Sequence, residues 1–316
     1  MFLLPILLLQ KSDIQDEIIA NQTRLGKLGM PSTKADLAKF EPTSASISAD
    51  KQFEMLGDSV REFATARFQK KPLPKLDWHK LTAGIDKLTG QPTSFFAIKI
   101  GDLMTFPKYS RGKLLAKELT AQAEADLKSG NKTRCLKLLK TAHALSTHSS
   151  WNQEFIGVLS ARAAFAVYIA SVKRVAASQR TWLVAHPELF RPLSQPNFRY
   201  IFDRDFVDTV VMVGKAFPVT KQTLPKNQTE LRGLLCSLQN WQVLYPKIQK
   251  SKDWSDASKG YLEVEAKLKH VETGTKIEGE EEDAKFTMTA DFLAGAQKLD
   301  EKLAQMNQEL AEFGKR

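Results

Sequence analysis

The chain has 316 residues, of which 42% are hydrophobic and 26% are charged. This composition is typical of a soluble globular protein and argues against a chain without a hydrophobic core. The formal net charge of +10 permits an anionic partner, such as a membrane surface or nucleic acid. Because the lysines are spread along the chain, we interpret the charge as a solvated basic surface and do not expect nucleic acid as the partner.

The N-terminal residues 1–10 form an apolar segment that begins MFLLPILLL. It is shorter than the about 20 residues that span a bilayer, and it lacks the basic start and the small-residue cleavage site of a complete secretory signal. Three interpretations stay open: a signal or anchor whose true start lies upstream, an apolar tail docked on the core, and a short interfacial anchor. We favour the first.

Residues 11–75 are predicted to contain N-terminal helices and a linker. An amphipathic helix follows Ser12, and a second helix start is indicated by Thr33, with Asp36 three positions later in the pattern of a capping box. The stretch 41–48 is rich in Pro, Ser and Thr and is interpreted as a linker or an extended segment. A further helix is predicted to end before the Lys-Lys-Pro-Leu-Pro sequence at 70–74.

Residues 76–275 are predicted to form the helical core, which begins with a short helix at 77–88. The stretch 93–100 has aromatic and β-branched residues in the manner of a strand. No partner strand is evident, so it is equally consistent with an extended connection that leads into the centre of the fold.

The centre of the prediction is a helical hairpin from about 111 to 145. Each of its two helices has an apolar face, and Gly130 and Asn131 interrupt the pattern where one residue must take positive φ. A third helix is predicted to start at 149–151 with Ser as N-cap, and its apolar residues on nearly every side suit the middle of a bundle. Arg162 breaks its apolar run, which argues against a membrane span.

The remaining core is predicted as three helices at 200–217, 230–248 and 256–271, after a proline-rich break at 186–196. An acidic run at 278–283 is interpreted as an exposed turn. The last segment, residues 284–314, is predicted as a C-terminal helix with roughly heptad spacing, which would dock along the body or pair with another chain.

The sequence lacks the usual motifs of phosphate binding, nucleophilic catalysis, zinc binding and thiol redox chemistry. His143 and His148 are five positions apart and do not share a helical face, so a metal site is not expected. The run from Asp203 to Asp205 is a candidate acid/base group, but adjacent helical residues point in different directions, which favours a local ion-pair surface. We therefore predict no catalytic, cofactor-binding or metal-binding residues and no cofactor, and we lean towards a protein that is not an enzyme.

The two cysteines and the tryptophans are assigned to the interior. Cys135 and Cys236 each lie in an apolar helical pattern, which favours two thiols over one disulfide and excludes neither compartment. The tryptophans have apolar neighbours, which suits a core or groove lining and not a nucleic-acid stacking platform. These are Trp151, Trp182, Trp241 and Trp254.

Two short patterns carry a resemblance. The turn from Gly29 to Leu37, and the hairpin with Gly130-Asn131, Cys135 and Leu139, resemble a family of helical bacterial proteins that begin with a signal or membrane anchor. Cys135 stands where the family has a small residue, usually Ala, and the chain departs from the family pattern at 44–50. The family has no established activity, so the resemblance implies a fold and an envelope location. The hairpin is also similar to one tetratricopeptide-type repeat, without a second copy in register.

Together these observations predict an all-α fold, an irregular helical bundle around a central repeat-like αα-hairpin. The expected function is a non-enzymatic scaffold or protein-binding module at the bacterial cell envelope, periplasmic or membrane-anchored, whose partner is another protein. The N-terminal residues are expected to provide membrane association. The alternatives are a basic cytoplasmic protein that binds nucleic acid nonspecifically and an enzyme whose site is assembled from distant residues.

Overall fold

A computed structural model describes residues 11–101, 106–151, 153–191, 193 and 196–272, with scattered positions between 293 and 312. Over these ranges the chain is helical and has no strand, so the predicted all-α fold is confirmed. The first helices are α1 (Lys11–Lys27), α2 (Lys34–Ala38), α3 (Ser44–Phe68), α4 (Trp78–Thr89), α5 (Phe106–Lys128) and α6 (Lys132–Thr147). They are followed by α7 (Phe155–Val184), α8 (Phe198–Gly214), α9 (Gln228–Lys250) and α10 (Trp254–Glu272). Short 3-10 turns lie at Ser149–Trp151 and Pro187–Phe190.

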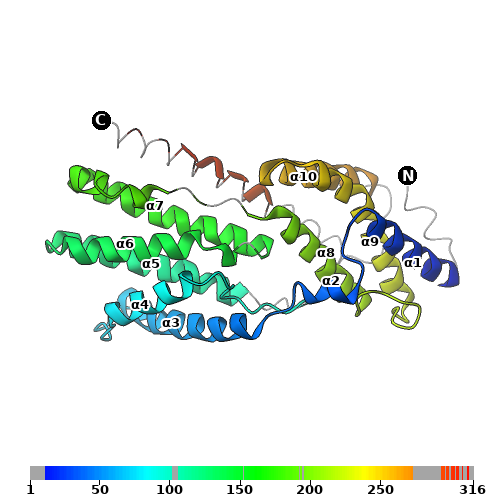
Figure 1. The fold of residues 1–316 in the computed structure, drawn as a ribbon, viewed down its shortest axis with the longest axis horizontal. Helices are drawn as coiled ribbons and strands as arrows, with labels where there is room; N and C mark the ends of the chain where they lie inside the picture. Colours follow the sequence, from blue (N-terminus) through cyan, green and yellow to red (C-terminus); the bar gives the residue numbers. More distant parts are fainter. Residues whose placement is uncertain are drawn as a thin grey trace.

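The helices divide into two groups along the long axis of the molecule (Figure 1). Helices α3 to α7 lie alongside one another at one end, whereas α1 and α9 lie towards the other end, with α8 and α10 between them. The strongest packing in the first group joins α5 to α6 and to α7, and in the second group α9 to α1, α8 and α10. Two separate hydrophobic clusters correspond to these groups.

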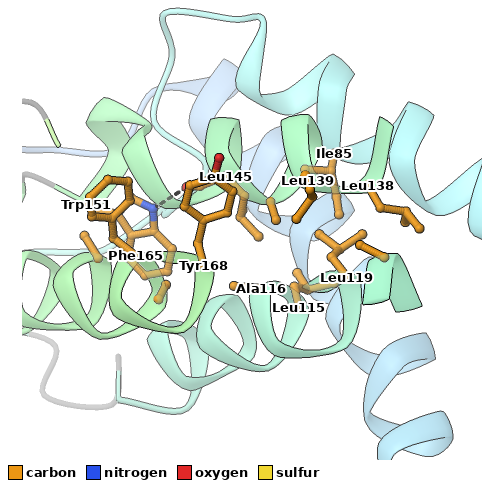
Figure 2. Close-up of a cluster of buried hydrophobic side chains, with 14 of the residues drawn as sticks. Ile85, Leu115, Ala116, Leu119, Leu138, Leu139, Leu145, Trp151, Phe165 and Tyr168 are labelled. Atoms are coloured by element: carbon orange, nitrogen blue, oxygen red, sulfur yellow. Dashed lines mark hydrogen bonds between the residues drawn. The ribbon is translucent and has the colours of Figure 1, made fainter. Parts of the chain in front are cut away.

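The hairpin of α5 and α6 is the centre of the first cluster and forms as predicted. Gly130 takes φ +81° in the turn, and Asn131 caps α6 by accepting a hydrogen bond from the backbone N of Arg134 at 3.1 Å. Figure 2 shows the apolar side chains that this hairpin buries against α4 and α7. At one end of this core the Trp151 indole donates a 2.7 Å hydrogen bond to the Leu145 carbonyl, as Figure 2 also shows.

Gly112 on α5 is required by the packing of that indole. A Cβ atom at this position would lie 2.1 Å from the Trp151 ring, so only glycine allows the helix to approach so closely. Trp151 itself is fully buried, and Trp241 and Trp254 are buried in the second cluster. Trp182 is partly buried against the first cluster. The prediction that the tryptophans line the interior is confirmed.

Helix α7 starts later than predicted. Residues 149–151 form a 3-10 turn, and α7 begins at Phe155 after Glu154, whose side chain makes no capping hydrogen bond. Within the described ranges, α7 is the helix whose length and composition would suit a membrane span, and 61% of its most apolar window is buried in the fold. Buried core helices have the same composition, and Arg162 in this helix is 2% exposed.

The N-terminal helices show one success and one error of the sequence analysis. Thr33 and Asp36 form the predicted capping box of α2: the Thr33 hydroxyl accepts from the Asp36 backbone N at 3.1 Å, and the Asp36 carboxylate accepts from the Thr33 backbone N at 3.1 Å. The linker predicted at 41–48 is too long, because Thr43 caps α3 through the backbone N of Ser46 at 3.1 Å and the helix already begins at Ser44.

The stretch 93–100 is an irregular connection, so the strand interpretation is wrong. Its aromatic and β-branched residues pack in the core. Phe95, Phe96 and Ile98 are buried in the first cluster, and the Phe95 and Phe53 rings stack with centroids 5.0 Å apart. Burial, and not pairing with a second strand, explains the composition.

The second cluster is built from parts of the chain that are distant in sequence. It combines residues of α1, and Met30 and Phe40 on either side of α2, with residues of α8, α9 and α10 and with the first turn of α7. Residues 11–75, grouped in one segment above, thus contribute to both clusters, α1 to the second and α3 to the first. The segment limits remain predictions.

The C-terminal segment is described at scattered positions from 293 to 312, all of them helical. Leu293 is buried in the second cluster, and Asp300 accepts hydrogen bonds from Arg162 of α7, one of them at 3.0 Å. The guanidinium of Arg162 also lies over the Trp254 ring, 5.7 Å from its centroid. The predicted apolar segment at 1–10 and the acidic run at 278–283 lie outside the described residues.

Candidate functional site

A group of buried and partly buried polar side chains lies where the two hydrophobic clusters meet. We call it the Arg204 cluster, and its members are Tyr109 of α5, Glu154 before α7, and Arg204 and Asp208 of α8. Arg204 is 1% exposed. A buried charge is costly unless it is paired and hydrogen-bonded, so the contacts of this arginine decide the character of the site.

The Arg204 guanidinium reaches both clusters. It donates to the carbonyl of Phe40 at 3.1 Å, in the second cluster, and to the carbonyl of Ile98 at 2.9 Å, in the first. These two hydrogen bonds join segments that are 164 and 106 positions away from Arg204 in the sequence. The arginine therefore ties together three distant parts of the chain.

Two carboxylates balance the charge of Arg204. Glu154 lies 3.3 Å from its Nη2 atom, and Asp208, one turn further along α8, lies 3.7 Å from its Nε atom. Burial by itself lowers the pKa of Arg204, but the nearby carboxylates of Glu154 and Asp208 raise it above its ordinary value. The guanidinium is therefore held in its charged form.

Asp208 also fixes the irregular connection that follows Ile98. Its Oδ1 atom accepts a 2.7 Å hydrogen bond from the backbone N of Gly101. Gly101 has φ +78°, a conformation that glycine adopts without the strain of a side chain. Arg204 and Asp208 thus hold this connection at two points.

Glu154 is the titratable member of the cluster near neutral pH. Burial raises its pKa to about 7, although Arg204 opposes the shift, and Asp208 adds to it by repulsion. Tyr109 is fully buried, and its pKa is raised well above the ordinary value by burial and then by the neighbouring Glu154 carboxylate. The phenol thus remains neutral, while Glu154 changes its charge close to physiological pH.

A carboxyl with such a pKa suits general acid or base catalysis, but structural ion networks shift pKa values in the same way. The contacts here favour the structural alternative. Arg204 is directed at two backbone carbonyls and two carboxylates of its own chain, and Asp208 at a backbone N–H. The arrangement is suited to holding α5, α7, α8 and the 93–101 connection in one geometry.

The sequence interpretation of the run from Asp203 to Asp205 as a surface ion-pair group is wrong for Arg204, which is buried. The expectation that the three side chains diverge agrees with the contacts of the first two. Burial raises the pKa of Asp203 to about 6, and this carboxyl lies beside Arg199 and Tyr245, away from Glu154. Asp203 and Arg204 therefore lie in two different environments, although they are adjacent in the sequence.

The histidines singled out by the sequence are not brought together with other metal ligands. The Nε2 atom of His143 lies 3.0 Å from the Arg191 carbonyl, and that of His148 lies 2.9 Å from the Gln91 carbonyl. Burial lowers the pKa of both histidines. Across the residues that the structure describes, no three His, Cys, Asp or Glu side chains are grouped as a metal site would require.

Both cysteines are free thiols, as predicted. Cys135 is buried in α6, and burial raises its pKa to about 11, with further contributions from Asp126 and Glu124. This keeps it protonated and unreactive. Cys236 is half-buried, 3.9 Å from the Nδ2 atom of Asn240.

Sequence reasoning missed Glu154, Asp208 and Tyr109 as partners of Arg204. One signal was present, since Arg204 and Asp208 are four apart on a predicted helix and so share a face. Nothing in the pattern around Glu154 or Tyr109 indicates that they meet α8, because that contact depends on the tertiary packing of α5, α7 and α8.

Comparisons with known proteins add no assignment: no protein family matches the chain, and neither the curated proteins nor the solved structures contain a significant match. The argument for function therefore depends on the chain itself.

Proposed function

We propose that this protein is a non-enzymatic helical scaffold that binds another protein at the bacterial cell envelope. The observation that carries the proposal is the Arg204 cluster. The buried charged groups of the site are engaged with each other and with the backbone of the chain, which is the arrangement of a rigid connection between two packed clusters.

A rigid connection is what a scaffold needs. A scaffold presents a fixed surface, and the ordering of that surface before binding reduces the entropy cost of association. Buried ion networks of this kind specify one geometry at some cost in stability. A second buried arginine, Arg162, is paired with Asp300 and so fixes the C-terminal segment to α7.

The envelope location is supported by the sequence. The apolar stretch 1–9 and the resemblance to anchored bacterial proteins both favour it. Helix α7 gives only weak support, because its membrane-like composition is also that of a buried core helix.

The proposal is tested by fractionating the host that carries a C-terminally tagged copy at the native locus, with mass spectrometry of the N-terminus. We expect recovery with the membranes or in the periplasm, and chemical crosslinking should then yield one dominant protein partner that also binds the purified chain. Recovery in the cytoplasm with an unprocessed start would contradict the envelope location. The absence of a partner that binds the purified chain would contradict the scaffold.

The net charge of +10 supports nucleic acid as the competing candidate. Nonspecific nucleic-acid binding releases counterions, so its affinity falls steeply as salt is raised. Fluorescence anisotropy with a labelled oligonucleotide over a range of salt concentrations separates the two. A scaffold for protein gives weak anisotropy changes at physiological salt, whereas tight binding with a steep slope would favour the competitor.

A further inference from the structure

The connection between α3 and α4 combines exposed apolar and basic side chains. We call residues 68–75 the basic loop; its sequence is Phe-Gln-Lys-Lys-Pro-Leu-Pro-Lys. Phe68 is 89% exposed and Leu73 is 51% exposed, and all eight positions are exposed. Large apolar side chains that are this accessible and lie together in a short segment mark an interaction surface.

The lysines of the loop leave its positive charge available. Lys70, Lys71 and Lys75 form no ion pair with the residues that the structure describes. The neighbouring Arg67 is engaged, since its Nη1 atom lies 2.6 Å from the buried Glu118 carboxylate. The charge of the loop thus faces solvent, as expected for a solvated basic surface, but three of the lysines are grouped in one short loop.

The backbone presents these side chains in a fixed conformation. Helix α3 ends with the backbone N of Lys71 donating to the Ala66 carbonyl at 2.9 Å and that of Lys70 to the Arg67 carbonyl at 3.2 Å, a Schellman motif with Lys70 at φ +54°. Two prolines then restrict the loop, and its far end is fixed where the Trp78 ring packs on Phe63, with centroids 5.5 Å apart. A loop fixed in this way loses little entropy on binding.

The basic loop also has a suitable position in the molecule. It lies at the end of the long axis opposite α1 and α9 (Figure 1). The turn between α5 and α6 lies at the same end and adds the exposed Lys128 and Lys132 (Figure 1). Both turns therefore place exposed lysines at the same end of the long axis.

We propose that the basic loop docks on an anionic lipid bilayer, with Phe68 and Leu73 inserted at the boundary of headgroups and acyl chains and the lysines at the lipid phosphates. Apolar side chains flanked by lysines suit this boundary, where burial of apolar area and attraction to anionic lipid act together. A nucleic acid would use the lysines and a ring but would leave the aliphatic Leu73 without a role. The inference deepens the proposed envelope location and depends on it for its biological setting.

The test is co-sedimentation of the full chain with phosphatidylglycerol–phosphatidylcholine vesicles and with phosphatidylcholine vesicles. We expect binding to the anionic vesicles alone. The double variant K70E/K71E should lower the partition coefficient at least about tenfold, and F68S/L73S about fivefold or more. The positions are exposed, so circular dichroism and the thermal midpoint should match those of the wild-type protein.

The control variant K252E/K259E changes the net charge by the same amount at exposed positions before and within α10. It should bind within about twofold of wild type, because charge outside the contact is largely screened. Equal losses in the control and loop variants, no loss in F68S/L73S, or no binding to anionic vesicles would each overturn the inference. A labelled oligonucleotide that loses affinity in K70E/K71E while vesicle binding persists would assign the loop to nucleic acid instead. Cytoplasmic recovery in the host would overturn the envelope location without changing the vesicle result.

Discussion

The two hydrophobic clusters are built in different ways. The first combines residues 49–189, and much of its packing joins helices that follow one another in the chain, such as α5 and α6. The second joins α1 to α9 and takes residues from both ends of the described chain, from Ile14 to Leu293. Local contacts close short loops, whereas the second cluster requires the closure of long ones. The buried arginine between them is therefore a connection between a locally formed and a distantly assembled core.

The largest expected effect is the loss of that connection. Arg204→Met removes the buried positive charge and leaves the partly buried Glu154 and Asp208 without their partner, so we expect a loss of about 3–5 kcal/mol in the free energy of unfolding. Denaturant unfolding followed by circular dichroism measures it. Lys226→Met, at an exposed position before α9, also removes one positive charge; it is the control and should change stability by less than about 0.5 kcal/mol. Equal effects would show that Arg204 contributes no more than a surface residue.

Leucine truncations compare the two clusters directly. Leu119 and Leu238 are both fully buried, one in each cluster. Each change to Ala should cost about 2–4 kcal/mol, because the buried isopropyl group of the leucine is lost and a cavity remains. Native-state hydrogen exchange should show that Leu119→Ala exposes amides mainly in α4 to α7, and Leu238→Ala mainly in α1 and α8 to α10. The same pattern of exchange in both variants would contradict two separate packing units.

The pH dependence of stability should reveal Glu154. Its folded pKa, about 7, is above the ordinary value of 4.5, so its contribution is fully present below about pH 4.5 and is lost as pH rises through 7. Glu154→Gln removes this loss, so the stability of the variant relative to wild type should increase between pH 5 and 8, by on the order of 1–3 kcal/mol.

The lowered pKa values of His143 and His148 act in the opposite direction, but they are common to the two proteins and cancel in the comparison. Thermal unfolding at a series of pH values provides the measurement. A difference between wild type and E154Q that does not change with pH would mean that Glu154 does not titrate in this range.

The smallest expected effect concerns the capping box of α2. Thr33→Ala removes the hydroxyl that accepts from the Asp36 backbone N, which should cost about 1 kcal/mol. Thr65→Ala on α3 is a matched control, because its exposed hydroxyl bonds only the carbonyl of the preceding turn. Urea unfolding of both variants decides whether the cap contributes, and equal midpoints would show that it does not.

Features formed by residues close together in the sequence could be predicted, and features formed by distant residues could not. The capping box of Thr33 and Asp36 and the turn at Gly130 were predictable, because the residues that form them are within a few positions of each other. The start of α3 at Ser44 was missed because Pro, Ser and Thr suit a helix N-terminus as well as a linker. The strand interpretation of 93–100 failed because Phe95 and Phe96 are buried in the hydrophobic core without being part of a sheet, and the sequence pattern does not distinguish the two cases.

The candidate site could not be predicted from the sequence. The partners of Arg204 come from Phe40, Ile98 and Glu154, and no local pattern records which distant backbone carbonyl an arginine will reach. The i, i+4 pair with Asp208 was visible, but such pairs are common on exposed helices and carry little information. Burial, which distinguishes this pair, is a property of the assembled fold.

Hydrogen exchange of Arg204→Lys by mass spectrometry tests the central claim most directly. Lysine keeps the charge but cannot donate in the planar geometry that reaches the Phe40 and Ile98 carbonyls together. We predict faster exchange on both sides of the connection, in 95–101 and the start of α7 as well as in α8 and the residues after Phe40. Faster exchange confined to α8, or no change, would contradict the view that Arg204 joins the two clusters.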